Sequence, residues 1–236
     1  MNFSESTVQL QHQGVKFSIT VLEATKPKSL VVFAAGRGGS PARHLPLLGA
    51  IADQGCTVIA PHFDLIPGHT PTKEQLDSRI RKLEIVLTKY LTPAAIPIIG
   101  IGHSIGATLL LALAGVKAMT FSGDLVETNF KSQFNGLVLL APAVDFYLHP
   151  GALNTLNTGV YLRTGAKDTV TPPERTILFK NMLEEKHEVR FILDENAGHF
   201  SYMDQLPPNV EDIQPEREIF LSALASDVTE YIVTLN

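Results

Sequence analysis

Apolar and polar positions alternate along the chain in blocks that predict strands and helices in turn. Short apolar runs rich in β-branched residues are typical of buried strands, and they occur at residues 30–35, 56–61, 95–101, 136–141, 160–164 and 189–193. Ahead of them, residues 8–11 and 15–23 flank Gly14 and predict an antiparallel pair.

Helical segments separate these runs. Residues 41–54 predict a helix, with Ser40 as N-cap and Gly55 beyond its end. Residues 73–90 predict an amphipathic helix whose leucines share one face while charges cover the other. Further helices are expected at residues 107–114, 173–186 and about 215–235. This alternation predicts an α/β fold, a mostly parallel sheet with helices on both faces.

Composition narrows the class of protein. A chain of 236 residues with 44% apolar and 18% charged residues can bury one core, so we expect one domain over residues 1–236. A net charge of -5 argues against a nucleic-acid partner. Cys56 is the only cysteine, which excludes an intramolecular disulfide and a cysteine metal cage. No signal segment or membrane-spanning run is visible, so we expect a cytoplasmic monomer or homodimer without membrane insertion.

One short motif carries the strongest chemical signal. Gly102-His103-Ser104-Ile105-Gly106 stands between a predicted strand and a predicted helix. A Gly-x-Ser-x-Gly string in that context is typical of a nucleophile elbow, a turn that holds a serine hydroxyl above the end of a strand. Glycine at 102 and 106 is needed because side chains there would collide with the neighbouring strand and helix. Ser104 is therefore a candidate nucleophile.

A serine nucleophile needs a base, and the base needs an acid that fixes its tautomer. His199 follows the strand at 189–193, and Asp168 follows the strand at 160–164. Asp168 could instead cap the segment that begins at Pro172. Two other acids compete for the role: Asp194 ends the strand before His199, and Asp145 follows the strand at 136–141.

Taken together, these motifs resemble the α/β-hydrolase family of serine hydrolases, in which nucleophile, acid and histidine follow in this order. The resemblance implies that Ser104, Asp168 and His199 form a catalytic triad. It also implies two backbone N–H donors for the oxyanion, those of Ile105 and Arg37. Residues 34–39 are similar to the family's His-Gly-x-Gly-Gly turn, although Ala35 stands where histidine is common. The Arg37 guanidinium could alternatively meet a substrate carboxylate.

The resemblance also bears on the substrate. Only residues 142–159 stand where the family inserts a cap, so we expect an open, cap-less site like those of dienelactone hydrolases and small carboxylesterases. Dienelactone hydrolases use cysteine where this chain has Ser104, so that narrow activity is not expected. We expect cleavage of a small or medium carboxylic ester, or a thioester, through an acyl-enzyme, with no cofactor and no metal. The alternatives are acyl transfer and a ligand-binding protein with little turnover.

Several other residues carry weaker expectations. His62 and His69 could line the pocket, and His103 is expected to pack or to hydrogen-bond a neighbouring strand. His12, His44, His149 and His187 are expected at the surface or in caps. We place residues 117–135 at the N-terminal edge of the strands with a structural role, and residues 205–215 beside the site.

Overall fold

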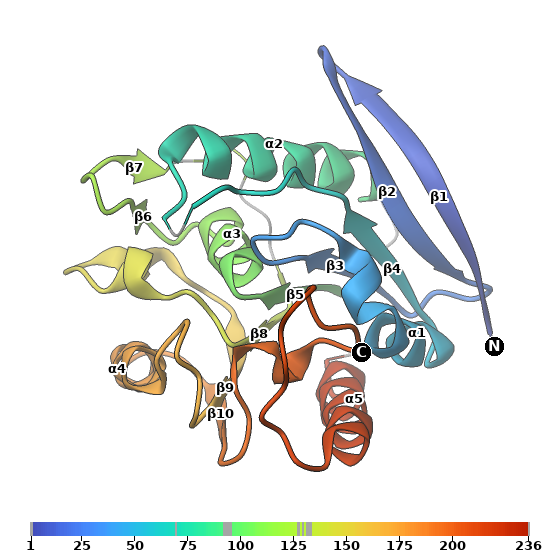
Figure 1. Cartoon of the computed structure of the whole chain (residues 1–236). Helices are drawn as coiled ribbons and strands as arrows, with labels where there is room; N and C mark the ends of the chain where they lie inside the picture. Colours follow the sequence, from blue (N-terminus) through green and yellow to red (C-terminus); the bar gives the residue numbers. More distant parts are fainter. Residues whose placement is uncertain are drawn as a thin grey trace.

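The chain folds around one eight-stranded sheet. The computed structural model describes residues 2–68, 70–91, 96–126, 128, 130 and 134–235. The strands stand in the order β1-β2-β4-β3-β5-β8-β9-β10 (Figure 1). Their bounds are β1 Phe3–His12, β2 Val15–Ala24, β3 Ser29–Ala34, β4 Cys56–Pro61, β5 Ile98–His103, β8 Gly136–Leu140, β9 Gly159–Gly165 and β10 Val189–Asp194. The six neighbouring strands β4, β3, β5, β8, β9 and β10 pair in parallel, while β2 is antiparallel to β4 and β1 is antiparallel to β2.

Helices cover both faces of this sheet (Figure 1). They are α1 Leu45–Asp53, α2 Lys73–Tyr90, α3 Ile105–Leu113, α4 Pro173–Glu184 and α5 Arg217–Val233. The first and last of them, α1 and α5, pack against each other on one face, and α2 packs on α3 on the other. Right-handed crossovers put α4 on the same face as α3. The predicted α/β class and the mostly parallel sheet are confirmed.

The segment 41–54 differs from its prediction. A 3₁₀ turn, η1 (Pro41–His44), precedes α1, and the Ser40 side chain accepts a hydrogen bond from the Ala42 N–H as expected of an N-cap. The break falls at His44, where the tighter turn directs the ring into the core. Its centroid lies 4.8 Å from that of Phe33, so the expectation of a surface histidine was wrong.

The segment 117–135 lies only in part at the predicted N-terminal edge of the strands, where the Asn135 N–H donates to the Ile98 carbonyl oxygen at the start of β5. It contains a small hairpin of β6 (Ala118–Met119) and β7 (Leu125–Val126). The ring of Phe121 at its tip packs 5.4 Å from that of Phe146, which follows the C-terminal end of β8. Figure 1 shows β7 beside the start of α2, and the charge of Asp124 acts on Lys73 there. After α3 the chain therefore turns back toward the C-terminal edge of the sheet. Residues 127, 129 and 131–133 of this segment lie outside the described residues.

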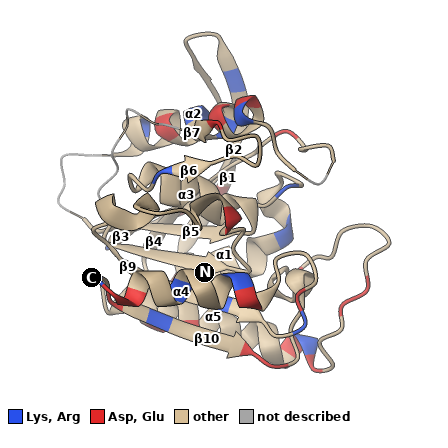
Figure 2. Cartoon of the chain, turned by 90° about the vertical axis from the view of Figure 1, so that its left-hand side faces the viewer, with Lys and Arg blue, Asp and Glu red and all other residues tan. Residues whose placement is uncertain are grey.

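No cap covers that edge among the described residues. The connection between β8 and β9 holds only two 3₁₀ turns, η2 (Asp145–Tyr147) and η3 (Ala152–Thr155), as expected for a cap-less protein. Acidic and basic residues are mixed on the face shown in Figure 2. Within the described chain, no helix has the length and apolar character needed to cross a membrane.

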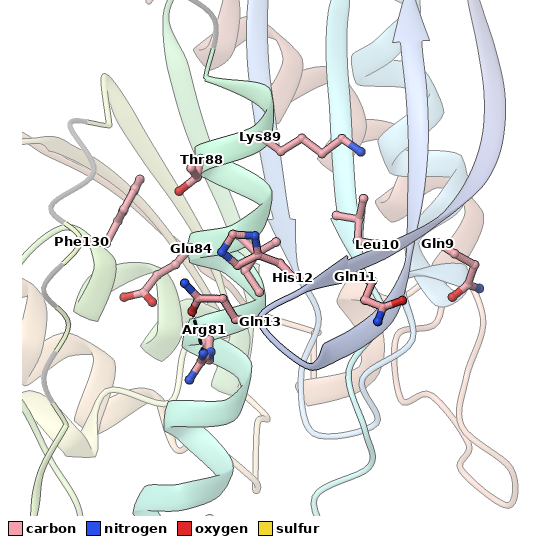
Figure 3. A pocket seen from close by; sticks show the side chains of 11 residues that line it. Gln9, Leu10, Gln11, His12, Gln13, Arg81, Glu84, Thr88, Lys89 and Phe130 are labelled. Atoms are coloured by element: carbon pink, nitrogen blue, oxygen red, sulfur yellow. Dashed lines mark hydrogen bonds between the residues drawn. The ribbon is translucent and has the colours of Figure 1, made fainter.

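A groove of about 870 Å³ lies between the β1–β2 hairpin and α2, at the β1 end of the sheet (Figure 3). Most of the residues that line it are polar, and Arg81 on α2 hydrogen-bonds Gln13 at the hairpin turn. None of the candidate nucleophile, base and acid residues lines this groove.

Candidate active site

Parallel strands bring the candidate residues to one edge of the sheet. Ala34 at the end of β3 pairs with Gly102 in β5, and Gly165 at the end of β9 pairs with Asp194 at the end of β10. Because all of these strands run in the same direction, the segments that follow them emerge together. Ser104, Asp168 and His199 lie in those segments.

Ser104 occupies a strained turn between β5 and α3. Its backbone has φ 56° and ψ −125°, a conformation that L-residues adopt rarely. A Cβ at Gly106 would lie 1.8 Å from the Ala34 carbonyl oxygen, and one at Gly102 would lie 2.5 Å from the Ala107 nitrogen. The expected need for glycine at both positions is thus confirmed. The local geometry is that of a nucleophile elbow.

His199 links the serine to an acid. Its Nε2 lies 3.0 Å from Ser104 Oγ, and its Nδ1 lies 2.9 Å from Asp168 Oδ2. The carboxylate accepts a hydrogen bond from Nδ1–H, which fixes the proton on Nδ1. Nε2 is then free to accept a hydrogen bond from the serine hydroxyl. All three residues are buried, with 6% of Ser104 exposed. The structure therefore joins the three predicted residues in one hydrogen-bonded chain.

Asp168 is held by its own turn. Its Oδ1 accepts hydrogen bonds of 2.8 Å from the N–H groups of Val170 and Thr171, and its Oδ2 accepts one of 2.7 Å from Thr171 Oγ1. Burial by itself raises the pKa of Asp168, but the hydrogen bond and charge of His199 and the Thr171 donors outweigh it, so the pKa falls below its usual value. Thr171 was missed in the sequence, although an aspartate three residues before a threonine is a capping pattern.

The competing acids have other partners. Both oxygens of Asp194 are bound by the Arg163 guanidinium, at 3.0 and 2.6 Å, and Asp194 also accepts a hydrogen bond from Tyr202. Asp145 pairs with Arg175 at 2.6 Å. Neither carboxylate is hydrogen-bonded to His199.

Two buried histidines lie behind His199. The His103 ring is 5.0 Å from the His199 ring and 5.2 Å from the His44 ring. The expected packing of His103 is therefore confirmed, and its Nε2 donates to the His199 carbonyl oxygen at 3.0 Å, in the turn that carries His199. Burial lowers the pKa of His44 to about 3 and holds the pKa of His103 well below its usual value. Both rings are therefore neutral near pH 7.

The turn after β3 lies against the nucleophile. The Gly39 N–H donates to the Gly36 carbonyl at 3.0 Å, and a Cβ at Gly36 would lie 3.1 Å from Ser104 Cβ. Within the described residues, the N–H groups of Arg37 and Ile105 have no acceptor in the protein. The Arg37 guanidinium is exposed and donates to the Gly68 carbonyl at 2.6 Å.

Two cations of α2 depart from the sequence prediction. The amphipathic pattern predicts that the charges of this helix are exposed, but only 3% of Arg79 and 6% of Lys82 is exposed. Arg79 donates to the carbonyl oxygens of Gly36, Arg37 and Asp64. Buried arginine is rare unless its donors are paired, and here backbone carbonyls pair them.

The remaining expectations have mixed outcomes. His62 hydrogen-bonds Thr20 on β2 at 2.9 Å, and His69 lies outside the described residues. The loop 205–215 borders the site as expected, because Ile213 lies against Gly198, next to His199. Among the described residues, no group of three or more His, Cys, Asp or Glu side chains could hold a metal ion.

Comparison with known proteins places this architecture in a class. No protein-family model and no curated protein matches the sequence. Among solved structures, the chain is similar to a dienelactone hydrolase from Anabaena variabilis, with a TM-score of 0.69, 16% identity and 99% of each chain covered. It is similar to an esterase from Pyrococcus furiosus, with a TM-score of 0.69, 17% identity, and 98% and 91% of the two chains covered. A carboxylesterase from Lactobacillus plantarum gives a TM-score of 0.65 at 15% identity, with 99% of each chain covered.

These similarities extend over nearly the whole chain. The protein therefore has the α/β-hydrolase fold, in the compact form without a sizeable cap. At such low identity the likeness concerns the fold, and the chemistry has to be argued from the site.

Proposed function

We propose that this protein is a serine hydrolase that cleaves a small or medium carboxylic ester. The observation that carries the proposal is the chain of hydrogen bonds Ser104–His199–Asp168, 3.0 and 2.9 Å long, with the serine on a strained elbow. A serine with no chemical task has no need of strained backbone, a neutral imidazole within reach of its hydroxyl and an oriented carboxylate beyond it.

The reaction follows from these contacts. Ser104 Oγ attacks the ester carbonyl carbon while His199 Nε2 takes its proton. The imidazolium is stabilised by ionised Asp168, whose lowered pKa keeps it charged near neutral pH. The imidazolium then protonates the leaving alcohol as the acyl-enzyme forms. Water, activated by the same imidazole, releases the acid and restores the hydroxyl.

The oxyanion needs donors that are fixed before the reaction begins. We assign this role to the N–H groups of Ile105, at the start of α3, and Arg37, in the turn beside Ser104. Neither N–H has a protein acceptor within the described residues, so both are available to the developing charge. The absence of histidine at Ala35 leaves both donors in place because they belong to the backbone.

Access to the site favours a small substrate. The connection between β8 and β9 leaves the edge uncovered within the described residues, which favours compact esters that diffuse directly to Ser104. The similar structures are named as a dienelactone hydrolase, an esterase and a carboxylesterase, which agrees with acyl transfer to water.

A graded ester panel tests this function. Wild type is expected to hydrolyse p-nitrophenyl acetate, butyrate and octanoate with saturation kinetics. Ser104→Ala should retain the fold and lose turnover by about 10⁴- to 10⁶-fold. Ser78→Ala, which removes an exposed hydroxyl on α2, should behave as wild type. Equal rates for wild type and Ser104→Ala would overturn the proposal.

A further inference from the structure

The buried Arg79 side chain makes contacts that point to a role in the reaction. Its guanidinium reaches from α2 to the turn after β3, where Nη1 donates to the Gly36 carbonyl oxygen at 2.9 Å and Nη2 to the Arg37 carbonyl oxygen at 2.8 Å. Nη2 also donates to the Asp64 carbonyl oxygen at 2.5 Å. In the described part of the chain Arg79 forms no ion pair with a carboxylate, so these carbonyls solvate its charge.

The Gly36 carbonyl is not an arbitrary acceptor. It belongs to the same peptide group as the Arg37 N–H, one of the two assigned oxyanion donors. A trans peptide is planar and its C=O and N–H point in opposite directions. A donor fixed on the carbonyl therefore fixes the direction of the N–H. Since the next carbonyl, that of Arg37, is also held by Arg79, the peptide groups on both sides of Arg37 are restrained.

We propose that Arg79 is a positioning residue for the oxyanion site. It holds the Gly36–Arg37 peptide so that the N–H faces the reacting carbonyl, and its positive charge polarises that peptide and strengthens the N–H as a donor. This inference rests on the proposed ester hydrolysis by Ser104.

The surroundings of Arg79 fix its position. The guanidinium lies 5.0 Å from the centre of the Phe63 ring, which suits a cation–π contact. Phe63 packs on the same turn, because a Cβ at Gly39 would lie 2.2 Å from the Phe63 carbonyl oxygen. Such a buried charge is costly unless hydrogen bonds compensate for the lost water. The three carbonyls and the ring supply that compensation, and they hold the guanidinium against the turn.

Lys82 offers a matched control on the same helix. It is also buried and also contacts Asp64, through an ion pair of 2.8 Å, but among the described residues it has no hydrogen bond or ion pair to the turn after β3. Lys82→Met therefore removes a buried cation without touching the oxyanion peptide.

The experiment measures ester hydrolysis and inhibition by a trifluoromethyl ketone, whose adduct with Ser104 carries the oxyanion. In Arg79→Met we expect kcat to fall by about 10- to 100-fold, less than the ~10²–10³-fold typical of deleting a donor. KM should change by less than about twofold, and the Ki of the ketone should rise by the same factor as kcat falls. Arg79→Lys, which keeps the positive charge but replaces the planar guanidinium by a single ammonium group, should recover part of both losses. Lys82→Met should keep kcat even if its Tm falls.

The outcomes separate this inference from the function on which it rests. If wild type neither hydrolyses esters nor binds the ketone, the proposed ester hydrolysis itself is wrong. If wild type is active, three results would overturn the role of Arg79 alone. These are a folded Arg79→Met with unchanged kcat, an unchanged Ki beside a lower kcat, or an equal loss of kcat in Lys82→Met. If Arg79→Met does not fold, the comparison of Arg79→Lys with Lys82→Met decides by the same criteria.

Discussion

At the scale of single residues, neighbouring carboxylates differ in what they touch, and this assigns them different tasks. Asp168 accepts hydrogen bonds from His199 and from its own turn. Asp194 neutralises the buried Arg163, which also binds Asp227 on α5. Asp145 forms a more exposed pair with Arg175. Ester hydrolysis needs an oriented His199 ring, so its rate should depend on Asp168 and not on Asp194 or Asp145.

Replacing each aspartate by asparagine checks this assignment. Asp168→Asn should lower kcat by about 10⁴-fold because the amide oxygen stays with the backbone N–H groups of the turn, so the NH2 group faces His199 Nδ1, donates to it and favours the wrong tautomer. Asp145→Asn should leave kcat near that of wild type. Ester kinetics on the purified, folded variants gives the comparison, and a larger loss in Asp145→Asn than in Asp168→Asn would contradict it.

Asp194→Asn should act on stability instead. Removing one partner of a buried ion pair leaves Arg163 without its bidentate acceptor and costs about 3–5 kcal/mol of unfolding free energy. Denaturant unfolding should show the loss, while kcat per folded molecule stays close to that of wild type. A normal midpoint with a catalytic defect would point to Asp194 as the acid.

The two buried histidines predict how stability depends on pH. Their folded pKa values lie below the unfolded value of about 6.5, so they bind more protons when the chain unfolds. Their contribution to stability is complete above pH 6.5 and is lost as the pH falls from there toward the folded pKa, about 3 for His44. Each contributes a slope of up to about 1.4 kcal/mol per pH unit in that window.

A variant that keeps the donors but cannot titrate tests this account. His44→Gln/His103→Gln should show a shallower loss of unfolding free energy between pH 6.5 and 4.5 than wild type. Denaturant titrations at several pH values supply the measurement. If the unfolding free energy falls equally steeply with pH in the two proteins, other titrating groups cause the loss of stability in acid.

At the scale of elements, the elbow shows how a close approach of main chains sets residue type. Gly106 faces the Ala34 carbonyl oxygen, so β3 and α3 meet without room for a methyl group. The sequence predicts this because glycine, serine and glycine stand at fixed spacing between an apolar strand and an apolar helix.

Two alanine substitutions compare a crowded glycine with a free one. Gly106→Ala should prevent folding or lower Tm by more than 10 °C, because the displaced strand or helix would lose core packing. Gly38→Ala, in the turn after β3, should be tolerated since nothing lies within 4 Å of the added Cβ. Thermal unfolding of both variants checks the contrast, and equal Tm values would refute the packing argument.

The strands and the three hydrogen-bonded site residues were predictable because each depends on a local pattern. Apolar runs mark the six strands β3, β4, β5, β8, β9 and β10, and Ser104, Asp168 and His199 all follow such runs. What could not be predicted depends on long-range packing. Arg79 stands at an ordinary helical position, and only the fold brings it to carbonyls 43 and 42 residues away. The sequence around His44 predicts a surface residue, but the 3₁₀ turn η1 directs its ring into the core. The β6–β7 hairpin was misplaced because no pattern shows which way a connection leaves a helix.

At the scale of the whole molecule, the open edge of the sheet predicts simple substrate kinetics. An enzyme with a large mobile lid gains activity when it meets aggregated substrate, because the lid must open first. The described connection after β8 is too short for such a lid. The rate should therefore follow one hyperbola as ester concentration passes its solubility limit. A steep rise at that limit would contradict an open site.

The central claim is that Ser104 is an activated nucleophile in an assembled triad, and one measurement addresses it directly. Wild type, Ser104→Ala and the control Ser78→Ala are incubated with a fluorophosphonate at neutral pH and analysed by intact mass and peptide mapping. The account predicts one adduct, on Ser104, in wild type and in the control, and none in Ser104→Ala. A folded wild type that takes up no label, or takes it up at another serine, would contradict the claim and favour a ligand-binding role for the same scaffold.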